Sequence, residues 1–353
     1  DCLLSRGLGD VYKRQVRGAL LMNVPAPNST APKLTGADKI DVTITAIVPL
    51  NDLVTRFEFK RSDGSLFPTF SGGAHTVVEM QDGDRKRLNP YSLMSDPANR
   101  ETFAISVRRD DEGRGGSLFM HNKVKIGDPM VISYPVNLFS LDLRARKHLF
   151  IAGGIGITPF LAQIKQLVRT NGNWELHYSC RNASLGSYVD ELTQKYPHSV
   201  HIHYDDEKDF IDLENLLHGQ PIGTHLYVCG PKGMIEWVRS TAGAAGWPTA
   251  HIHYEEFLAP KPGKPFAVRL AKSGVTVKVG AHESLLEAIE RLGVEAPYLC
   301  RGGACGQCET DVIESDGAFM HRDHWLEDEE KALGVKIMPC VSRFEGKTLV
   351  LDR

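Results

Sequence analysis

Four cysteines near the carboxyl end of the chain have the spacing of metal ligands. Cys300, Cys305 and Cys308 lie in the segment CRGGACGQC, and Cys340 follows much later in KIMPC. Thiolates are soft ligands that suit zinc, copper(I) and iron–sulfur clusters. Zinc sites favour two short Cys-x2-Cys arms, whereas Cys-x4-Cys-x2-Cys followed by a distant cysteine is the plant-type spacing. The spacing therefore predicts a [2Fe–2S] cluster, with zinc or unligated thiols as the alternative.

A glycine-rich turn indicates a second binding site. The segment GGIGITP (153–159) follows KHLFIAGG, an apolar run that is typical of a buried strand. Gly154 and Gly156 permit a tight turn and the close approach of a pyrophosphate, and Thr158 favours the start of a helix. Such a turn can also serve only to pack a strand against a helix.

A second strand of the same region ends in VCGP, which places Cys229, Gly230 and Pro231 at its carboxyl end. Ligands bind at that edge of open α/β sheets, so we expect a dinucleotide there and Cys229 as a candidate catalytic residue. The alternative for Cys229 is a small buried apolar side chain. Arg181, just past the strand WELHYSC, would meet either a cofactor 2′-phosphate or solvent.

Two further segments predict a flavin site. NPYSLMSDP (89–97) offers an aromatic face and a hydroxyl, from Tyr91 and Ser92, on a strand. GRGGSLFMH (113–121) places Gly115, Gly116 and Ser117 at a helix start beside Arg114, which would suit a phosphate. Each segment alone is more often an ordinary turn. Together, in a barrel that precedes a dinucleotide domain and a [2Fe–2S] domain, they favour a flavin.

A pair of similar strands carries spaced histidines. HIHYDD (201–206) and HIHYEE (251–256) each place two histidines on one strand face, where they could bind metal. We interpret the two segments as similar strands of one sheet that end in acidic turns.

The elements that must position these residues form three blocks. Short alternating runs predict an antiparallel β-barrel for flavin at 40–146, in which only SLFMHNKV is helical. Alternating strands and helices predict a parallel-sheet α/β domain for NAD at 147–258. The segment APKPGKP (259–265) is a linker, and 266–353 would be an α+β ferredoxin domain of the β-grasp type.

The amino-terminal segment, 1–39, is expected to be a leader outside the fold. Residues 1–21 have no periodic pattern and resemble translated adaptor sequence, so Met22 is the expected start, and VPAPNSTAPKLTGADK is rich in Pro, Ser, Thr and Ala.

Composition excludes several classes of function. Hydrophobic residues make up 42% of the chain and charged residues 24%, with a net charge of −3, which suits a globular protein without a nucleic-acid partner. No apolar run is long enough to span a bilayer. The chain has 7 cysteines, four of them in one cluster, which does not resemble a disulfide framework, so we expect a cytoplasmic protein.

In the order of these motifs, the chain resembles the phthalate dioxygenase reductase family, which includes vanillate demethylase reductases and the reductase component of carnitine monooxygenase. The resemblance covers roughly residues 40–353. It implies transfer of electrons from NADH through FMN to a [2Fe–2S] cluster, and then to a Rieske-type oxygenase that hydroxylates or demethylates a small substrate, of the carnitine or the aromatic acid class. It also implies a transient oxygenase partner, and we expect a monomer.

The resemblance assigns roles to individual residues. Tyr91 would pack on the isoalloxazine, and Ser92, a candidate catalytic residue, would lie near its reactive N5 edge. The residues that would hold the ribityl phosphate are Arg108, Gly115, Gly116 and Ser117. The residues that match the nicotinamide-cofactor motifs are Gly154, Gly156, Thr158, Cys229, Gly230 and Pro231. Phe257, in YEEF, matches the aromatic residue that ends the flavin–NAD module.

One position departs from the family pattern. Asn89 stands where the flavin motif Arg-x-Tyr-Ser usually has its arginine, so one positive charge is missing, which Arg108 or Arg114 could supply.

The expected chemistry explains why three groups occur together. NADH gives up two electrons as a hydride and a cluster accepts one at a time, so a flavin must lie between them. The alternatives are an FAD-containing NAD(P)H reductase for another acceptor and a non-enzymatic electron-carrier or zinc module.

Overall fold

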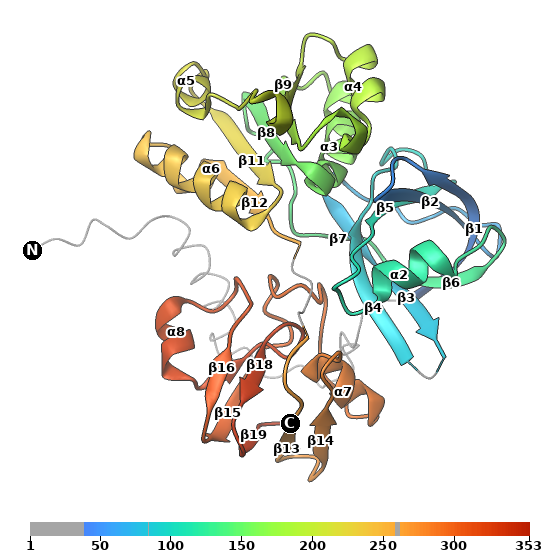
Figure 1. The fold of residues 1–353 in the computed structure, drawn as a ribbon, viewed down its shortest axis with the longest axis vertical. Coiled ribbons are helices and arrows are strands. Elements are labelled where there is room, and N and C mark those ends of the chain that lie inside the picture. The colour runs from blue at the N-terminus through green and yellow to red at the C-terminus, as the bar shows by residue number, and fades with distance from the viewer. Residues whose placement is uncertain (1–38, 84, 258–261) are drawn as a thin grey trace, which may run out of the picture. The chain divides into compact units, whose positions relative to one another are not determined.

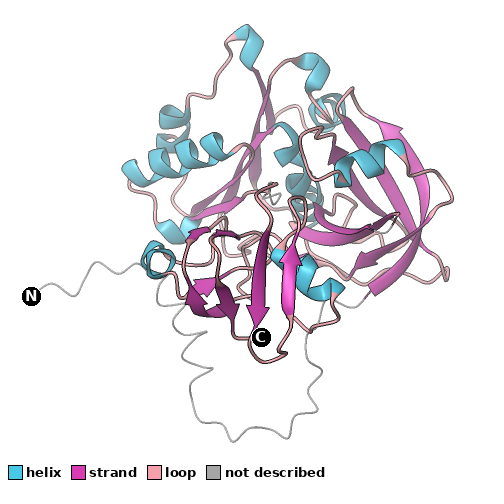
Figure 2. Cartoon of the chain, turned by 60° about the horizontal axis from the view of Figure 1, so that its bottom comes forward, coloured by secondary structure: helices cyan, strands magenta, loops and turns pink. Residues whose placement is uncertain are grey.

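The structure is a computed structural model of the chain, and it describes residues 39–83, 85–257 and 262–353. Met22, nearly all of the expected leader and the first part of the expected linker lie outside the described residues. The described residues form three main sheets (Figures 1 and 2). They divide into two compact units, of which one holds the parallel sheet and the other holds the antiparallel sheet, residues 158–166 and the last block. Within the described part, no helix is both long and apolar enough to cross a membrane.

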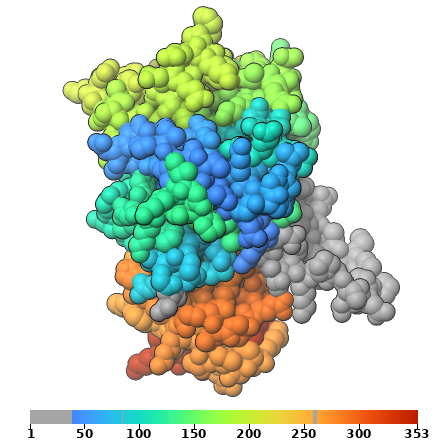
Figure 3. All heavy atoms as spheres, turned by 90° about the vertical axis from the view of Figure 1, so that its right-hand side faces the viewer, coloured from blue at the N-terminus to red at the C-terminus, as the bar shows by residue number. Residues whose placement is uncertain are grey.

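The first sheet is antiparallel and has the order β4-β3-β6-β1-β2-β5, with β7 paired to β3. Its strands are β1 (Lys39–Pro49), β2 (Val54–Arg61), β3 (Ala74–Asp82), β4 (Arg85–Ser92), β5 (Phe103–Arg108), β6 (Pro129–Ser133) and β7 (Val136–Asn137). One helix, α2 (Gly116–Asn122), lies in this block and matches the predicted helical segment. Figure 3 shows part of the surface that these residues form, coloured blue to green.

One face of this sheet covers a single core, as the alternating burial along β1 shows. Ile40, Val42 and Ile44 on β1 are buried while their neighbours are not, because successive side chains of a strand point to opposite faces. Phe57 and Phe59 on β2 are completely buried in the same cluster. The chain that leaves β4 reaches the other edge of the sheet, where Met94 N–H donates to Ala104 O on β5. The predicted antiparallel barrel is therefore confirmed.

The second sheet is parallel and has the order β10-β9-β8-β11-β12. Its strands are β8 (Lys147–Gly153), β9 (Trp174–Cys180), β10 (Val200–Tyr204), β11 (Thr224–Cys229) and β12 (Ile252–Glu255). The helices that connect them are α3 (Thr158–Arg169), α4 (Val189–Lys195), α5 (Leu213–His218) and α6 (Lys232–Ala244). The central strands β8 and β11 are buried almost throughout, as expected of a sheet that is covered on both faces.

The last block is a mixed sheet of order β14-β13-β19-β15-β17 with a separate pair, β16-β18. Its strands are β13 (Phe266–Leu270), β14 (Thr276–Val279), β15 (Thr310–Ser315), β16 (Ala318–Met320), β17 (Lys336–Ile337), β18 (Arg343–Glu345) and β19 (Leu349–Leu351). The helices are α7 (Leu285–Arg291) and α8 (Asp328–Leu333). The block has its own core, and α7 begins with a capping box between Ser284 and Glu287.

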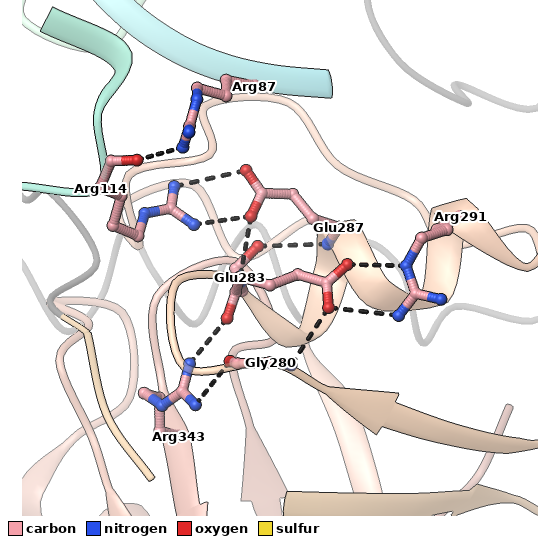
Figure 4. A network of polar contacts seen from close by, with 8 residues as sticks. Arg87, Arg114, Gly280, Glu283, Glu287, Arg291 and Arg343 are labelled. Atoms are coloured by element: carbon pink, nitrogen blue, oxygen red, sulfur yellow. Dashed lines mark hydrogen bonds and ion pairs between the residues drawn. The ribbon is translucent and has the colours of Figure 1, made fainter. Parts of the chain in front are cut away.

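Buried Arg343 binds the described part of the expected linker, residues 262–265, to this block. Its guanidinium donates to the carbonyls of Gly280 at 3.0 Å and Glu283 at 2.7 Å, as Figure 4 shows. It also donates to the carbonyl of Lys264 at 2.9 Å. Three carbonyl acceptors balance the cost of burying this charge.

Candidate functional site

The four predicted metal-ligating cysteines come together in the last block as two pairs. The thiols of Cys300 and Cys305 are close enough for each to shift the pKa of the other, and the Sγ atoms of Cys308 and Cys340 lie 3.3 Å apart. A tetrahedral zinc with Zn–S bonds near 2.3 Å needs its sulfurs all about 3.8 Å apart. Within the described residues, no three cysteine sulfurs lie within 4.8 Å of one another. Two sulfurs at each of two positions fit a two-iron cluster and do not fit one zinc.

The loop around these cysteines supplies backbone donors. Gly302 N–H donates to Cys300 Sγ at 3.3 Å. The hydrogen bond from Cys305, and further the amides around Gly302, lower the pKa of Cys300 to about 5. Gly303 and Gly306 both have φ of 74°, and a side chain at Gly306 would collide with Trp325. The glycines therefore let the loop close around the thiolates and turn its N–H groups towards them.

The predicted dinucleotide edge contains one glycine in the left-handed region and one close backbone approach. Gly154 has φ of 53°, and a side chain at Gly156 would collide with the carbonyl of Cys229. Cys229 is the last residue of β11 and is completely buried. Gly230 and Pro231 follow it and lead into α6, for which Pro231 is the N-cap residue. These residues thus gather where β8 and β11 end, as the sequence predicted.

Three other predicted cofactor residues have plainer surroundings. Thr158 is buried and is the first residue of α3. Arg181 follows β9 with an exposed side chain, which is compatible with either predicted contact. Phe257, the last residue before the undescribed part of the linker, is 45% exposed.

Glu255 lies beside Cys229, and the sequence motifs did not indicate it as a residue of the site. The two residues are direct neighbours on the parallel strands β12 and β11. The residue is half-buried, but its Oε2 is fully buried and has no hydrogen-bond partner among the described residues. Burial raises the pKa of this carboxyl to about 8, and it also raises the pKa of the Cys229 thiol. Only the pairing register shows which acidic residue of YEEF is enclosed.

On β4, the predicted flavin residues share a strand with an arginine that the sequence did not single out. Arg87, Asn89 and Tyr91 alternate along the strand and therefore lie on one face. Asn89 Nδ2 donates to Tyr91 Oη at 3.2 Å, and burial raises the pKa of Tyr91 to about 12. A side chain at Gly116 would collide with Asn89, and one at Gly115 would come within 3.1 Å of the Arg87 guanidinium. Arg87 therefore lies beside the start of α2.

Two buried polar atoms near Tyr91 lack partners. Ser92 pairs with His75 of β3, and both residues are buried. Neither Ser92 Oγ nor His75 Nε2 has a hydrogen-bond partner among the described residues. Burial alone lowers the pKa of His75 to about 4, so its ring is neutral at pH 7. Unsatisfied polar atoms at this position fit a site that a polar ring system would complete.

The other residues of the predicted phosphate site are largely engaged elsewhere. Ser117 Oγ accepts a hydrogen bond from Asp110 N–H at 3.0 Å, and Arg108 is exposed at the end of β5. Arg114 pairs with Glu287 of α7 through two contacts, and its carbonyl accepts a hydrogen bond from Arg87 (Figure 4). Arg87 is thus the arginine on the Asn89–Tyr91 face of β4.

Family models and known proteins match this chain over most of the described blocks. The family described as "2Fe-2S iron-sulfur cluster binding domain" matches residues 268–345, and "Dimethylamine monooxygenase subunit DmmA-like, N-terminal domain" matches residues 131–252. The chain is 44% identical to the heme-dependent oxidative N-demethylase beta subunit of Ectopseudomonas mendocina over 89% of this chain and 98% of that protein. It is also 44% identical to the carnitine monooxygenase reductase subunit of Acinetobacter baumannii, over 88% and 96%.

A solved structure covers nearly the same range. Phthalate dioxygenase reductase, described as a modular structure for electron transfer from pyridine nucleotides to [2Fe–2S], superposes with a TM-score of 0.81 and 34% identity. The match covers 89% of this chain and 98% of that chain.

The barrel, the parallel sheet and the cysteine-bearing ferredoxin block define a modular electron-transfer oxidoreductase. Within that class, the chain belongs to the family of oxygenase reductase components that includes phthalate dioxygenase reductase, vanillate O-demethylase oxidoreductase and the carnitine monooxygenase reductase subunit. The resemblance drawn from the motifs and the predicted three-part fold class are both confirmed.

Proposed function

We propose that this chain carries electrons from NADH, through FMN and a [2Fe–2S] cluster, to a separate oxygenase. When bound, a flavin can take two electrons as a hydride and release them singly, which a one-electron cluster requires. The observation that supports the proposal most is the division of the cysteine quartet into the pairs Cys300–Cys305 and Cys308–Cys340 in a chain that also has a nucleotide-type edge. We assign the flavin domain to residues 40–146, the NAD domain to 147–258 and the ferredoxin domain to 266–353.

For the flavin, we assign contacts to the face of β4. Tyr91 would cover the isoalloxazine ring, and the unpaired Ser92 Oγ would donate to its polar edge. Arg87 would meet the phosphate, because a guanidinium and a phosphate form strong charge-assisted hydrogen bonds. The remaining candidate phosphate contacts are Asn89, Arg108, Gly115, Gly116 and Ser117.

For the nucleotide, the carboxyl edge of the parallel sheet supplies the contacts. Gly154 and Gly156 would admit the pyrophosphate, and Cys229 would lie against the nicotinamide. Thr158, Gly230, Pro231 and Phe257 complete the candidate contacts, and Arg181 is the candidate for the adenosine end. We favour NADH over NADPH on the family resemblance.

For the partner, we propose an oxygenase that acts on a small amine, bound transiently by a monomeric, cytoplasmic reductase. The support is that relatives at 44% identity are named for carnitine and for oxidative N-demethylation, whereas those named for phthalate and vanillate are 33–37% identical. One relative is haem-dependent, so a Rieske-type partner and a haem partner are the two forms of oxygenase to test.

The test compares the full-length protein with Cys305→Ser. Both should oxidise NADH with ferricyanide, because a small acceptor can collect electrons from the flavin directly. The variant should fail with cytochrome c and with the oxygenase, because the one-electron exit is missing. Cys180→Ser, at a buried cysteine outside the quartet, is the matched control and should keep all three activities.

Two results would contradict the proposal. Oxygenase turnover that survives in Cys305→Ser would mean that electrons leave from the flavin and not from the cluster. Chromatography of heat-released flavin should give FMN, and a predominance of FAD would favour the alternative of an FAD-containing reductase for another acceptor.

A further inference from the structure

Three histidines and one glutamate gather on one face of the parallel sheet, and Glu175 and His201 are each the second residue of their strand. Glu175 and His177 come from β9, and His201 and His203 come from β10. His201 is the direct neighbour of His177 in the parallel register. Because ligands of such sheets bind at the carboxyl ends of the strands, this group of side chains is separate from the nucleotide edge.

The distances within this group suit one metal ion. His177 Nε2 lies 3.0 Å from Glu175 Oε1, and His201 Nε2 lies 3.5 Å from the same oxygen. All three ligand atoms lie within 4.8 Å of one another. Zinc bonds of roughly 2.0–2.1 Å in a tetrahedron place ligand atoms about 3.3–3.4 Å apart. We propose that Glu175, His177 and His201 form a Zn²⁺ site whose fourth position is open to water.

A second set of contacts orients His177 for this role. Its Nδ1 lies 3.0 Å from His203 Nε2, and His203 Nδ1 lies 3.4 Å from Asp209 Oδ1. If each ring donates towards the carboxylate of Asp209, His177 Nε2 carries a lone pair that faces Glu175 Oε1. In the other tautomer, His177 Nε2 donates to that oxygen at 3.0 Å, and zinc would take the place of this hydrogen bond. Metal-binding histidines usually have such a partner on their other nitrogen.

Lys147 orients the carboxylate of Glu175. Its Nζ lies 2.6 Å from Glu175 Oε2, which leaves Oε1 directed at the two histidines. The side chain of His201 is 45% exposed, so an ion can enter from solvent, whereas Glu175 and His177 are largely buried at 17% and 11%. Two imidazoles and one carboxylate are a common ligand set for zinc. Zinc would then fasten β10, an edge strand of the sheet, to β9.

The chain contains a matched group that lacks the carboxylate. His225 of β11 and His251 and His253 beside or on β12 repeat the arrangement, with His225 Nδ1 at 2.9 Å from His253 Nε2. The position two residues before His225 is Gly223, where the first group has Glu175. Among the described residues, only Glu175, His177 and His201 form a set of three donor atoms close enough for one ion. The second group therefore serves as an internal control.

The experiment is a zinc titration of the full-length protein with flavin and cluster in place, after chelator treatment, against a fluorescent zinc indicator. The visible spectrum verifies that the cluster stays intact, so that the cysteines are not free to take the ion. Wild type should bind one zinc more per chain than Glu175→Gln or His201→Gln, and His251→Gln should bind as wild type does. His203→Gln should weaken binding by about ten- to a hundredfold, as loss of an orienting partner does.

A second measurement guards against misfolded variants. Zinc should raise the thermal midpoint of wild type and of His251→Gln, since a ligand that binds only the folded state stabilises it, and should leave Glu175→Gln and His201→Gln unchanged. NADH–ferricyanide activity should be the same in all of them. Equal zinc uptake in wild type, Glu175→Gln and His201→Gln would overturn the proposal, as would the absence of any uptake at micromolar zinc.

Discussion

Arg114 Nη1 lies 2.6 Å from Glu287 Oε2, and Arg114 Nη2 lies 3.3 Å from Glu287 Oε1 (Figure 4). Arg114 precedes α2 in the barrel block, and Glu287 belongs to the first turn of α7 in the ferredoxin block. Both side chains are nearly buried, at 13% and 12% exposure. The arginine that the sequence offered for a flavin phosphate is therefore paired with a carboxylate across two blocks of one compact unit.

This ion pair predicts a defect in electron transfer and not in flavin binding. In Arg114→Ala, FMN content should match wild type, while reduction of the cluster after reduction of the flavin should slow by about tenfold, because the two blocks lose a fixed contact. Stopped-flow absorbance follows both steps. Glu287→Gln should reproduce the effect, since Gln still supports the capping box. Arg109→Ala, whose partner Asp111 is exposed, is the control.

If Arg114 instead holds the phosphate, the opposite pattern appears. Arg114→Ala would then lose FMN, and Glu287→Gln would keep wild-type rates. That result would return Arg114 to the role that its position beside Gly115 first indicated.

A second prediction concerns Arg87. Arg87→Ala should raise the Kd for FMN by roughly tenfold or more, because a hydrogen bond to a charged group contributes about 1.5–3 kcal/mol. Arg85→Ala, at an exposed position of the same strand, should leave the Kd unchanged. Flavin fluorescence on release measures both. An unchanged Kd in Arg87→Ala, together with weaker binding in Arg108→Ala, would assign the phosphate to β5.

The contrast between Asn89 and Arg87 shows where sequence reasoning stopped. The motif predicted the strand correctly, because alternation and local spacing are written along the chain. The flavin contacts of its hydroxyl and its aromatic residue stay predictions. The motif also predicted a missing charge at Asn89. The arginine two residues earlier shares the same face, but its nearness to Gly115 depends on how α2 packs, which no local pattern encodes. Glu255 was missed for the same reason, since strand register alone encloses it beside Cys229.

Long-range contacts also determine which of the two HIH segments can contribute to a metal site. The two HIH segments are alike along the chain, so the sequence alone predicts two similar strands of one sheet that end in acidic turns. The two groups of histidines differ in the residue that precedes the paired histidine by two positions. This residue is Glu175 before His177 and Gly223 before His225. The cysteine quartet could be predicted without long-range information, because the spacing of three ligands within one loop already limits the metal.

A third prediction tests Cys229. Cys229→Ala should slow flavin reduction by NADH by about tenfold while the Kd for NADH changes little, because a misplaced nicotinamide loses orientation more than affinity. Cys180→Ala is the matched control, since Cys180 is also a buried cysteine at the end of a strand, β9. Rapid mixing at several NADH concentrations separates rate from affinity. An unchanged limiting rate would make Cys229 a packing residue only.

The last prediction uses the buried carboxyl of Glu255. Its pKa is raised from 4.5 to about 8 by burial, so the unfolded chain ionises this group at lower pH than the folded chain does. Between those values unfolding releases a proton, and stability must fall as pH rises, levelling off above pH 8. Glu255→Gln removes that loss. Its thermal midpoint, relative to wild type and without NADH, should therefore rise steadily from pH 5 to pH 8. Glu256→Gln should run parallel to wild type over the same range.

A difference in thermal midpoint between Glu255→Gln and wild type that stays constant with pH would contradict this prediction. It would mean that Glu255 is already ionised in the folded protein, and that more water reaches the space beside Cys229 than the enclosed Oε2 indicates.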